Sequence, residues 1–385
     1  MNFTVNNNNI KDTTGIIKYS CGAMFILFCY CYIFFIQGEV LAKAQFVYSG
    51  GLTYYHSIMS PLVIAVVLQI IQYVNFSLLR LPQRFYSFSY CPSCLILAML
   101  SDFNDAKIEH FHFGVWAWCM PLLLILYVLT TLLIRKIFKD KIQDKQTFDI
   151  LITPNCIILL ILFLGVGSIG NNKDIFFYEL KTERLIYEKK YDDAVNVGER
   201  ALVSTPKLTQ LRMYALAKLD ELPERIFDFP QYYGADGLLP SYDTIRVNRV
   251  LSSDIYIFIG TIPGKGVKNI EQYLNLMMNG NKQRSKTAVD YYLCFQLLNK
   301  NLTNFEQVFY NNYNPNKIIP RAYQEALLLK AELDGDSLSF ISQETIERYN
   351  AYKLEKAQFL SDNARKNKTR QHFGNTYWWY YENME

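Results

Sequence analysis

The C-terminal part of this 385-residue sequence has almost no cysteine: of the eight cysteines, Cys294 alone follows residue 170. A domain stapled by disulfides in an oxidising compartment would need an even set of spaced cysteines. This part must therefore be stabilised by an apolar core. Cys294 itself lies within the aromatic run 291–295, where we expect a small buried hydrophobe rather than a reactive thiol.

Net charge is also close to zero after residue 170, where 28 Lys and Arg stand against 27 Asp and Glu. Nucleic-acid binding requires a basic face that neutralises phosphates, so we expect no nucleic-acid partner. The sequence also lacks a catalytic signature. The run 260–266 is one residue short of a phosphate-binding loop and ends on Gly266 where Ser or Thr would hold Mg²⁺. The catalytic residues therefore stay unknown, and no cofactor or metal is assigned.

What the sequence does have is long hydrophobic segments, all before residue 170. Each is close to the roughly 20 apolar residues that cross a hydrocarbon core of about 30 Å. One of them, 85–101, is shorter and contains Pro92, so it is either a short span or a re-entrant segment. The first is too long for a cleavable signal peptide. We predict a polar tail at 1–15, a transmembrane domain of about five helices at 16–170 (spans 16–37, 58–79, 85–101, 114–134 and 150–169) and a helical domain at 171–385.

The loop after the fourth span sets the orientation, because short loops rich in Lys and Arg stay in the cytoplasm. It contains Arg135, Lys136, Lys139, Lys141 and Lys145. The fifth span then leads outward, and the domain 171–385 is extracytoplasmic. If 85–101 only re-enters the membrane, the N-terminus changes side, but this domain does not.

One stretch of the C-terminal domain, 190–206, resembles the second helix of a tetratricopeptide repeat. Tyr191 would close the turn between the helices, Ala194 and Ala201 would let them approach closely, Pro206 would end the unit, and Tyr178 would pack from the first helix. Apolar periodicity predicts further helices, and no alternating strand pattern competes. They lie at 208–219, 244–259, 270–278, 286–299, 305–311, 320–333 and 343–362. We expect an all-α, degenerate repeat array with a concave surface for proteins or peptides.

Three local features have alternative interpretations. Cys91 and Cys94 form a CxxC motif suited to thiol–disulfide exchange, but no βαβ pattern surrounds them. The loop 102–112 gathers three carboxylates and two imidazoles that could bind a metal, although a solvated loop is the simpler interpretation. At 334–337, Gly335 is expected to end a helix rather than belong to a calcium loop.

The C-terminal stretch 373–381 contains six aromatic residues in nine positions. We expect it to pack against the helical domain. The alternatives are a partner surface or a place at the outer membrane interface, at the level of Trp116 and Trp118.

Three segments carry a resemblance to a known group of proteins. They are 90–93 leading into 95–100, then 320–328, and finally Phe373 with 376–378. In these the chain resembles an uncharacterised family of Bacteroidota inner-membrane proteins with several spans and a tetratricopeptide-like C-terminal region. The resemblance implies a multi-pass protein of the bacterial inner membrane with a periplasmic C-terminal domain. It implies no catalytic residue.

These observations favour a membrane-anchored scaffold, surrounded by lipid, whose periplasmic helical domain binds a protein or peptide. The candidate partner-binding residues mix charge, amide and aromatic character on one helix: Arg321, Tyr323, Gln324 and Glu325. A membrane-embedded enzyme acting on lipid or glycan is the alternative, with Glu39, Asp102, Asp105 and Glu109 as its acidic candidates. A transporter accessory subunit is a second alternative, disfavoured because the spans have almost no ionisable residues at their centres.

Overall fold

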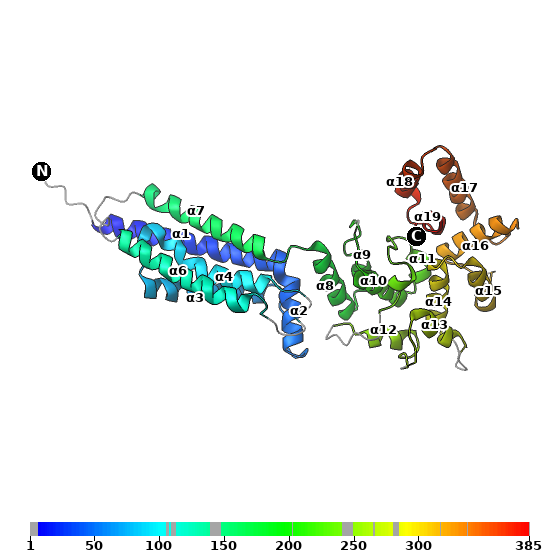
Figure 1. Ribbon diagram of the computed structural model, residues 1–385, viewed down its shortest axis with the longest axis horizontal. Helices are drawn as coiled ribbons and strands as arrows, with labels where there is room; N and C mark the ends of the chain where they lie inside the picture. Colours follow the sequence, from blue (N-terminus) through cyan, green and yellow to red (C-terminus); the bar gives the residue numbers. More distant parts are fainter. Residues whose placement is uncertain are drawn as a thin grey trace. The chain divides into compact units, whose positions relative to one another are not determined.

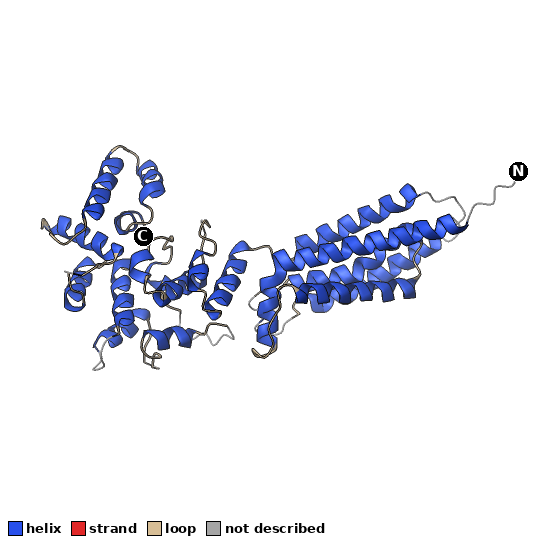
Figure 2. Ribbon diagram, turned by 180° about the vertical axis from the view of Figure 1, so that it is seen from behind, coloured by secondary structure: helices blue, strands red, loops and turns tan. Residues whose placement is uncertain are grey.

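The computed structural model divides the chain into two compact units, Met1–Lys173 and Asp174–Glu385. It describes residues 7–104, 108, 113–138, 148–201, 203–240, 249–264, 266–279, 285–315, 317–336 and 338–384. These residues form helices, turns and irregular segments, and Figure 2 shows no strand among them. The all-α fold class is confirmed.

The first unit is built on long apolar helices. Its elements are α1 (Asn7–Tyr32), η1 (Ile33–Gln37), α2 (Gly38–Tyr48), α3 (Met59–Leu79), η2 (Gln83–Tyr90), α4 (Cys91–Ser101), α6 (Trp116–Phe138) and α7 (Phe148–Ile169). In Figure 1, α1, α3, α4, α6 and α7 run alongside one another. Within the described residues, four stretches are long and apolar enough to cross a membrane, namely Gly15–Tyr48, Met59–Leu79, Trp116–Phe138 and Leu151–Ile169. The chain is therefore a membrane-associated protein.

The first of these helices continues past the predicted end at residue 37. The π-helical turn η1 follows α1 directly, and Gly38 keeps right-handed helical dihedrals (φ −57°, ψ −43°), so the chain runs on to Tyr48. No proline interrupts it.

The predicted third span, 85–101, is divided between the 3₁₀ helix η2 and the short helix α4. Polar side chains of neighbouring helices satisfy its backbone and hydroxyl groups. Asn155 Oδ1 accepts the Ser87 N–H at 2.7 Å and Gln72 Nε2 donates to Ser89 Oγ at 2.7 Å. These bonds hold the segment inside the helix bundle.

The second unit contains the shorter helices. They are α8 (Asp174–Tyr187), α9 (Tyr191–Asn196), α10 (Pro206–Lys218), α11 (Leu222–Arg225), η3 (Gly234–Gly237), α12 (Ser252–Ile259), α13 (Ile270–Asn279), α14 (Lys286–Leu298), α15 (Leu302–Asn312), α16 (Arg321–Asp334), α17 (Gln343–Ala357), α18 (Asp362–Phe373) and α19 (Tyr377–Asn383). The predictions for α10, α13, α14, α15 and α16 are confirmed. The predicted helix 343–362 ends early, at Ala357, and extended Ser361 (ψ 131°) precedes the next helix, α18. For the predicted helix 244–259, residues 244–248 lie outside the described residues.

The tetratricopeptide-like segment differs from the expected repeat at its second helix. Helix α9 has only six residues, because Val197 is extended and Gly198 adopts a left-handed φ of +62°. A Cβ atom at Gly198 would lie 2.8 Å from the Tyr178 ring, so this close approach requires glycine. Consequently Ala201 lies outside any helix, and Pro206 begins α10 instead of ending a repeat. Tyr191 begins α9, and Ala194 is fully buried where α8, α9 and α10 meet.

The C-terminal aromatic segment packs into the core of the second unit, as the favoured interpretation predicts. Tyr377, Trp378, Trp379 and Tyr380 are all buried. The Trp378 ring lies 5.0 Å from that of Tyr349 on α17, and the Tyr377 ring 5.4 Å from that of Phe227. Placement of these tryptophans at the membrane interface is wrong, because the domain itself covers them. Cys294 is also fully buried, and Gly335 ends α16 with a left-handed φ of +78°, both as predicted.

Candidate functional site

The four predicted partner-binding residues lie on α16, but only Arg321 and Gln324 are partly exposed. Tyr323 is fully buried, and its hydroxyl donates to Asp290 Oδ1 at 3.0 Å. Gln324 Oε1 accepts the Ser342 N–H at 3.0 Å. This bond holds the start of α17 against α16. The alternation of polar and aromatic side chains therefore reflects contacts inside the domain, and Tyr323 and Glu325 are not on its surface.

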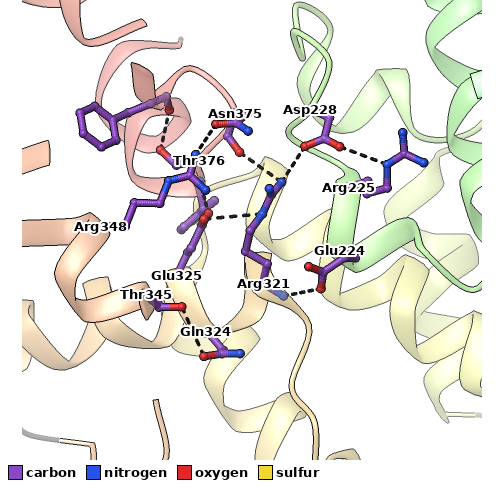
Figure 3. A network of polar contacts seen from close by, with 12 residues as sticks. Glu224, Arg225, Asp228, Arg321, Gln324, Glu325, Thr345, Arg348, Asn375 and Thr376 are labelled. Carbon is purple, nitrogen blue, oxygen red and sulfur yellow. Dashed lines mark hydrogen bonds and ion pairs between the residues drawn. The ribbon is translucent and has the colours of Figure 1, made fainter. Parts of the chain in front are cut away.

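Arg321 and Glu325 form the centre of a polar network (Figure 3). Glu325 is 1% exposed, and its Oε2 accepts the Tyr377 N–H at 2.6 Å. The Arg321 backbone N–H donates to Glu224 Oε2 at 2.8 Å, and its Nη2 donates to Asp228 Oδ1 at 2.7 Å. Through these bonds α16 joins the region of α11 to the start of α19.

The Glu325 carboxyl has unusual electrostatics. Burial raises its pKa to about 7, although the Tyr377 N–H, Arg321 and Arg348 act in the opposite direction. Its Oε1 has no hydrogen-bond partner among the described residues and lies 3.8 Å from Arg321 Nε. Desolvation therefore outweighs the attraction of the nearby guanidinium groups.

A pocket of about 410 Å³ adjoins this network and shares Asp228, Arg348 and Asn375 with it. Three parts of the second unit enclose it: the segment after α9, the segment after α11, and helices α17 to α19. We call it the arginine pocket after its basic residues Arg200, Arg348 and Arg370. The Glu325–Tyr377 bond fixes α19, which supplies Trp379 and Tyr380 to the lining.

The three arginines differ from most others of the domain in their partners. Arg348 Nη2 donates to the Asn375 side-chain oxygen at 2.7 Å, and Arg370 Nη2 donates to the Tyr232 hydroxyl at 3.0 Å. Within the described ranges, none of the three forms an ion pair, whereas Arg225 and Arg321 both pair with Asp228. Of the two acids in the lining, Asp228 is thus already neutralised, which leaves Glu199. The pocket has surplus positive charge.

Aromatic residues lie beside these charges, and among them the Tyr232 ring is 41% exposed. Phe227, Phe229, Trp379 and Tyr380 line the pocket and are at most 5% exposed. The Arg370 guanidinium lies 5.8 Å from the centre of the Trp379 ring, within the range of a cation–π contact. Trp379 Nε1 is a buried donor with no partner among the described residues. The arrangement suits a ligand that combines an anionic group with an apolar one.

The residues proposed for the other activities lie in the first unit. Asp102 Oδ2 accepts from Trp116 Nε1 at 2.8 Å, and Glu39 lies in the first turn of α2. Asp105 and Glu109 lie outside the described residues, as does most of the candidate metal loop 102–112. Cys91 and Cys94 are free cysteines at the start of α4.

Comparison with known proteins gives one family. DUF6057, a family of unknown function, matches residues 105–263 and 265–383, which is most of the chain. No curated protein and no solved structure matches. The resemblance to an uncharacterised family is confirmed at this level.

Proposed function

The chain belongs to the DUF6057 family, and we propose that it is a membrane-anchored binding protein whose helical domain takes up a protein or peptide partner in the arginine pocket. The observation that carries this proposal is a group of three arginines in one pocket, none of which has an ion-pair partner among the described residues, beside aromatic rings. Arg200 and Arg370 are exposed at the pocket, and Arg348 is half-buried. Unpaired arginines concentrated in one concavity favour recognition of an anionic partner.

We further propose that the domain lies in the periplasm, on the evidence of charge. Helix α6 ends in Arg135 and Lys136, and the basic residues that follow them in the sequence keep this loop in the cytoplasm. A fifth crossing by η2 and α4 fits their dimensions. Beyond the kink at Phe85 (φ −120°, ψ 25°), residues 86–90 at about 2.0 Å each and α4 at about 1.5 Å per residue would extend roughly 26 Å if collinear, which approaches the ~30 Å of the hydrocarbon core.

Binding is favoured over catalysis by the residue types of the pocket. Its described lining contains no serine, threonine or cysteine that could act as a nucleophile. His372 at the rim is paired with Glu355 at 2.9 Å, and its side chain is 66% exposed. A lipid- or glycan-modifying enzyme and a transporter accessory subunit remain the alternatives.

Selection from random-peptide libraries displayed with free N-terminal and with free C-terminal ends tests this function. The bait is the full chain in lipid nanodiscs, with the variant Arg348→Gln/Arg370→Gln selected in parallel. We expect the wild type to enrich peptides that bind with a Kd near or below about 10 µM, and the double variant to bind them at least 10-fold more weakly.

The matched control is Lys368→Gln, which removes one positive charge from the same helix as Arg370 at an exposed position outside the pocket. It should bind the enriched peptides like the wild type. If no peptide is enriched on the wild type, or if the double variant binds equally well, the proposal is wrong.

A further inference from the structure

We infer that the arginine pocket recognises the free C-terminal end of its partner, with the α-carboxylate at the arginines and an aromatic or other apolar last side chain against the exposed Tyr232 ring. This inference rests on the proposed function, since it specifies which part of a protein or peptide enters the pocket.

The carboxylate is the group that the arginines fit best. A guanidinium has five N–H donors in a planar fork, which matches the two oxygens of a carboxylate. Among described partners, the Arg348 side chain makes a single hydrogen bond, to the neutral Asn375 amide. Arg200 makes none and is exposed. Both side chains therefore have donors available for an anion.

The aromatic side of the pocket calls for more than a small inorganic anion. A free anion would leave the Tyr232 ring, which is 41% exposed, uncovered, whereas an apolar side chain adjoining the carboxylate would bury against it. The amide side chains of Gln371 and Asn375 also line the pocket. Amide groups are suited to pair with a peptide bond near the end of a chain.

The size of the pocket favours a chain end over a continuous strand of peptide. Its volume of about 410 Å³ lies toward the lower end of the range of roughly 300 to 1,000 Å³ that small-molecule sites occupy. The last one or two residues of a chain match such a space. Capture of a terminal carboxylate is one of the recurring modes of peptide recognition.

The test compares one enriched peptide as a free acid and as a C-terminal amide, with the full chain in nanodiscs. We expect amidation to weaken binding at least 10-fold. The acid and the amide should bind about equally to Arg348→Gln, because this variant lacks the guanidinium that binds the carboxylate of the acid. Should Arg348→Gln fail to fold, as judged by circular dichroism, Arg200→Gln gives the same comparison at an exposed position.

The outcomes separate the two proposals. If the amide binds the wild type as tightly as the acid, the terminal carboxylate is excluded while peptide binding stands. If neither form binds, both proposals fail. Inorganic phosphate at about 10 mM should displace less than half of the bound free-acid peptide. Displacement by submillimolar phosphate would instead identify a phosphorylated ligand and overturn the inference.

Discussion

Replacement of Glu325 by alanine should make the C-terminal segment 373–384 open more often from the rest of the second unit. In the wild type, Glu325 Oε2 accepts the Tyr377 N–H at 2.6 Å, and this bond fixes the first residue of α19. Alanine would leave the buried N–H of Tyr377 without this acceptor and would leave a cavity next to Arg321. The rest of α19 would keep its aromatic contacts, so we expect local opening rather than global unfolding.

The expected change in the free energy of local opening follows from the kind of hydrogen bond that is lost, one between a carboxylate and a buried backbone N–H. A hydrogen bond to a charged group contributes about 1.5 to 3 kcal/mol, and an unsatisfied buried donor costs a similar amount. A loss of about 2 kcal/mol in the free energy of local opening corresponds to roughly 30-fold faster exchange of the amide hydrogens.

Hydrogen exchange followed by mass spectrometry on the full chain in detergent measures this effect. Peptides covering 373–384 should exchange faster in Glu325→Ala, while peptides from α14, which is buried from Ala288 to Leu298, should not change. Glu325→Gln is the control, because its side-chain oxygen can still accept the Tyr377 N–H. If Glu325→Ala exchanges at the wild-type rate, the bond does not fix α19.

Three further predictions concern buried groups, the first of them again Glu325. Since burial raises the pKa of Glu325 to about 7 from its usual 4.5, its stabilising effect is complete below about pH 4.5 and is lost as the pH rises through 7. Chemical denaturation should show wild type losing about 3 kcal/mol of unfolding free energy, relative to Glu325→Gln, between pH 4.5 and 8. Asn155→Ala should lower the melting temperature in detergent, with a loss of about 2 kcal/mol or more, because the Asn155 amide bonds Ser87, Gln83 and Leu151. Cys294, fully buried and with its pKa raised by burial, should react with thiol reagents only after denaturation, as peptide mass mapping would show.

Apolar periodicity was sufficient to locate most of the helices. Helices α10, α13, α14 and α16 begin and end within about two residues of their predicted bounds, because each has a regular apolar stripe and a proline, serine or glycine near one end. Helix α9 was not predictable in the same way. Its early end depends on the contact between Gly198 and Tyr178, which are 20 positions apart, and periodicity contains no information on such a contact.

The roles of the α16 residues could not be predicted for a related reason. Polar side chains at Arg321 and Glu325 suggest an exposed face when only the helix is considered. Their partners Asp228 and Tyr377 come from segments 93 and 52 residues away, and these contacts decide that Glu325 is buried. The arginine pocket likewise combines three distant segments. One local signal existed: Arg370 has no acidic residue three or four positions away on α18, so no helical ion pair could neutralise it.

The polar network and the arginine pocket share helix α19. Glu325 fixes the start of α19 through Tyr377, and two positions later Trp379 forms part of the pocket. A ligand that contacts Trp379 and Arg348 can bind tightly only when this segment is docked. Binding and docking must therefore stabilise each other by the same free energy. An enriched peptide should slow the exchange of amide hydrogens at 373–384 in the wild type. Glu325→Ala should weaken peptide binding only if the open form of this segment becomes populated enough to compete with the docked form. Protection by the peptide without any change at 373–384 would place its site elsewhere and separate the network from the pocket.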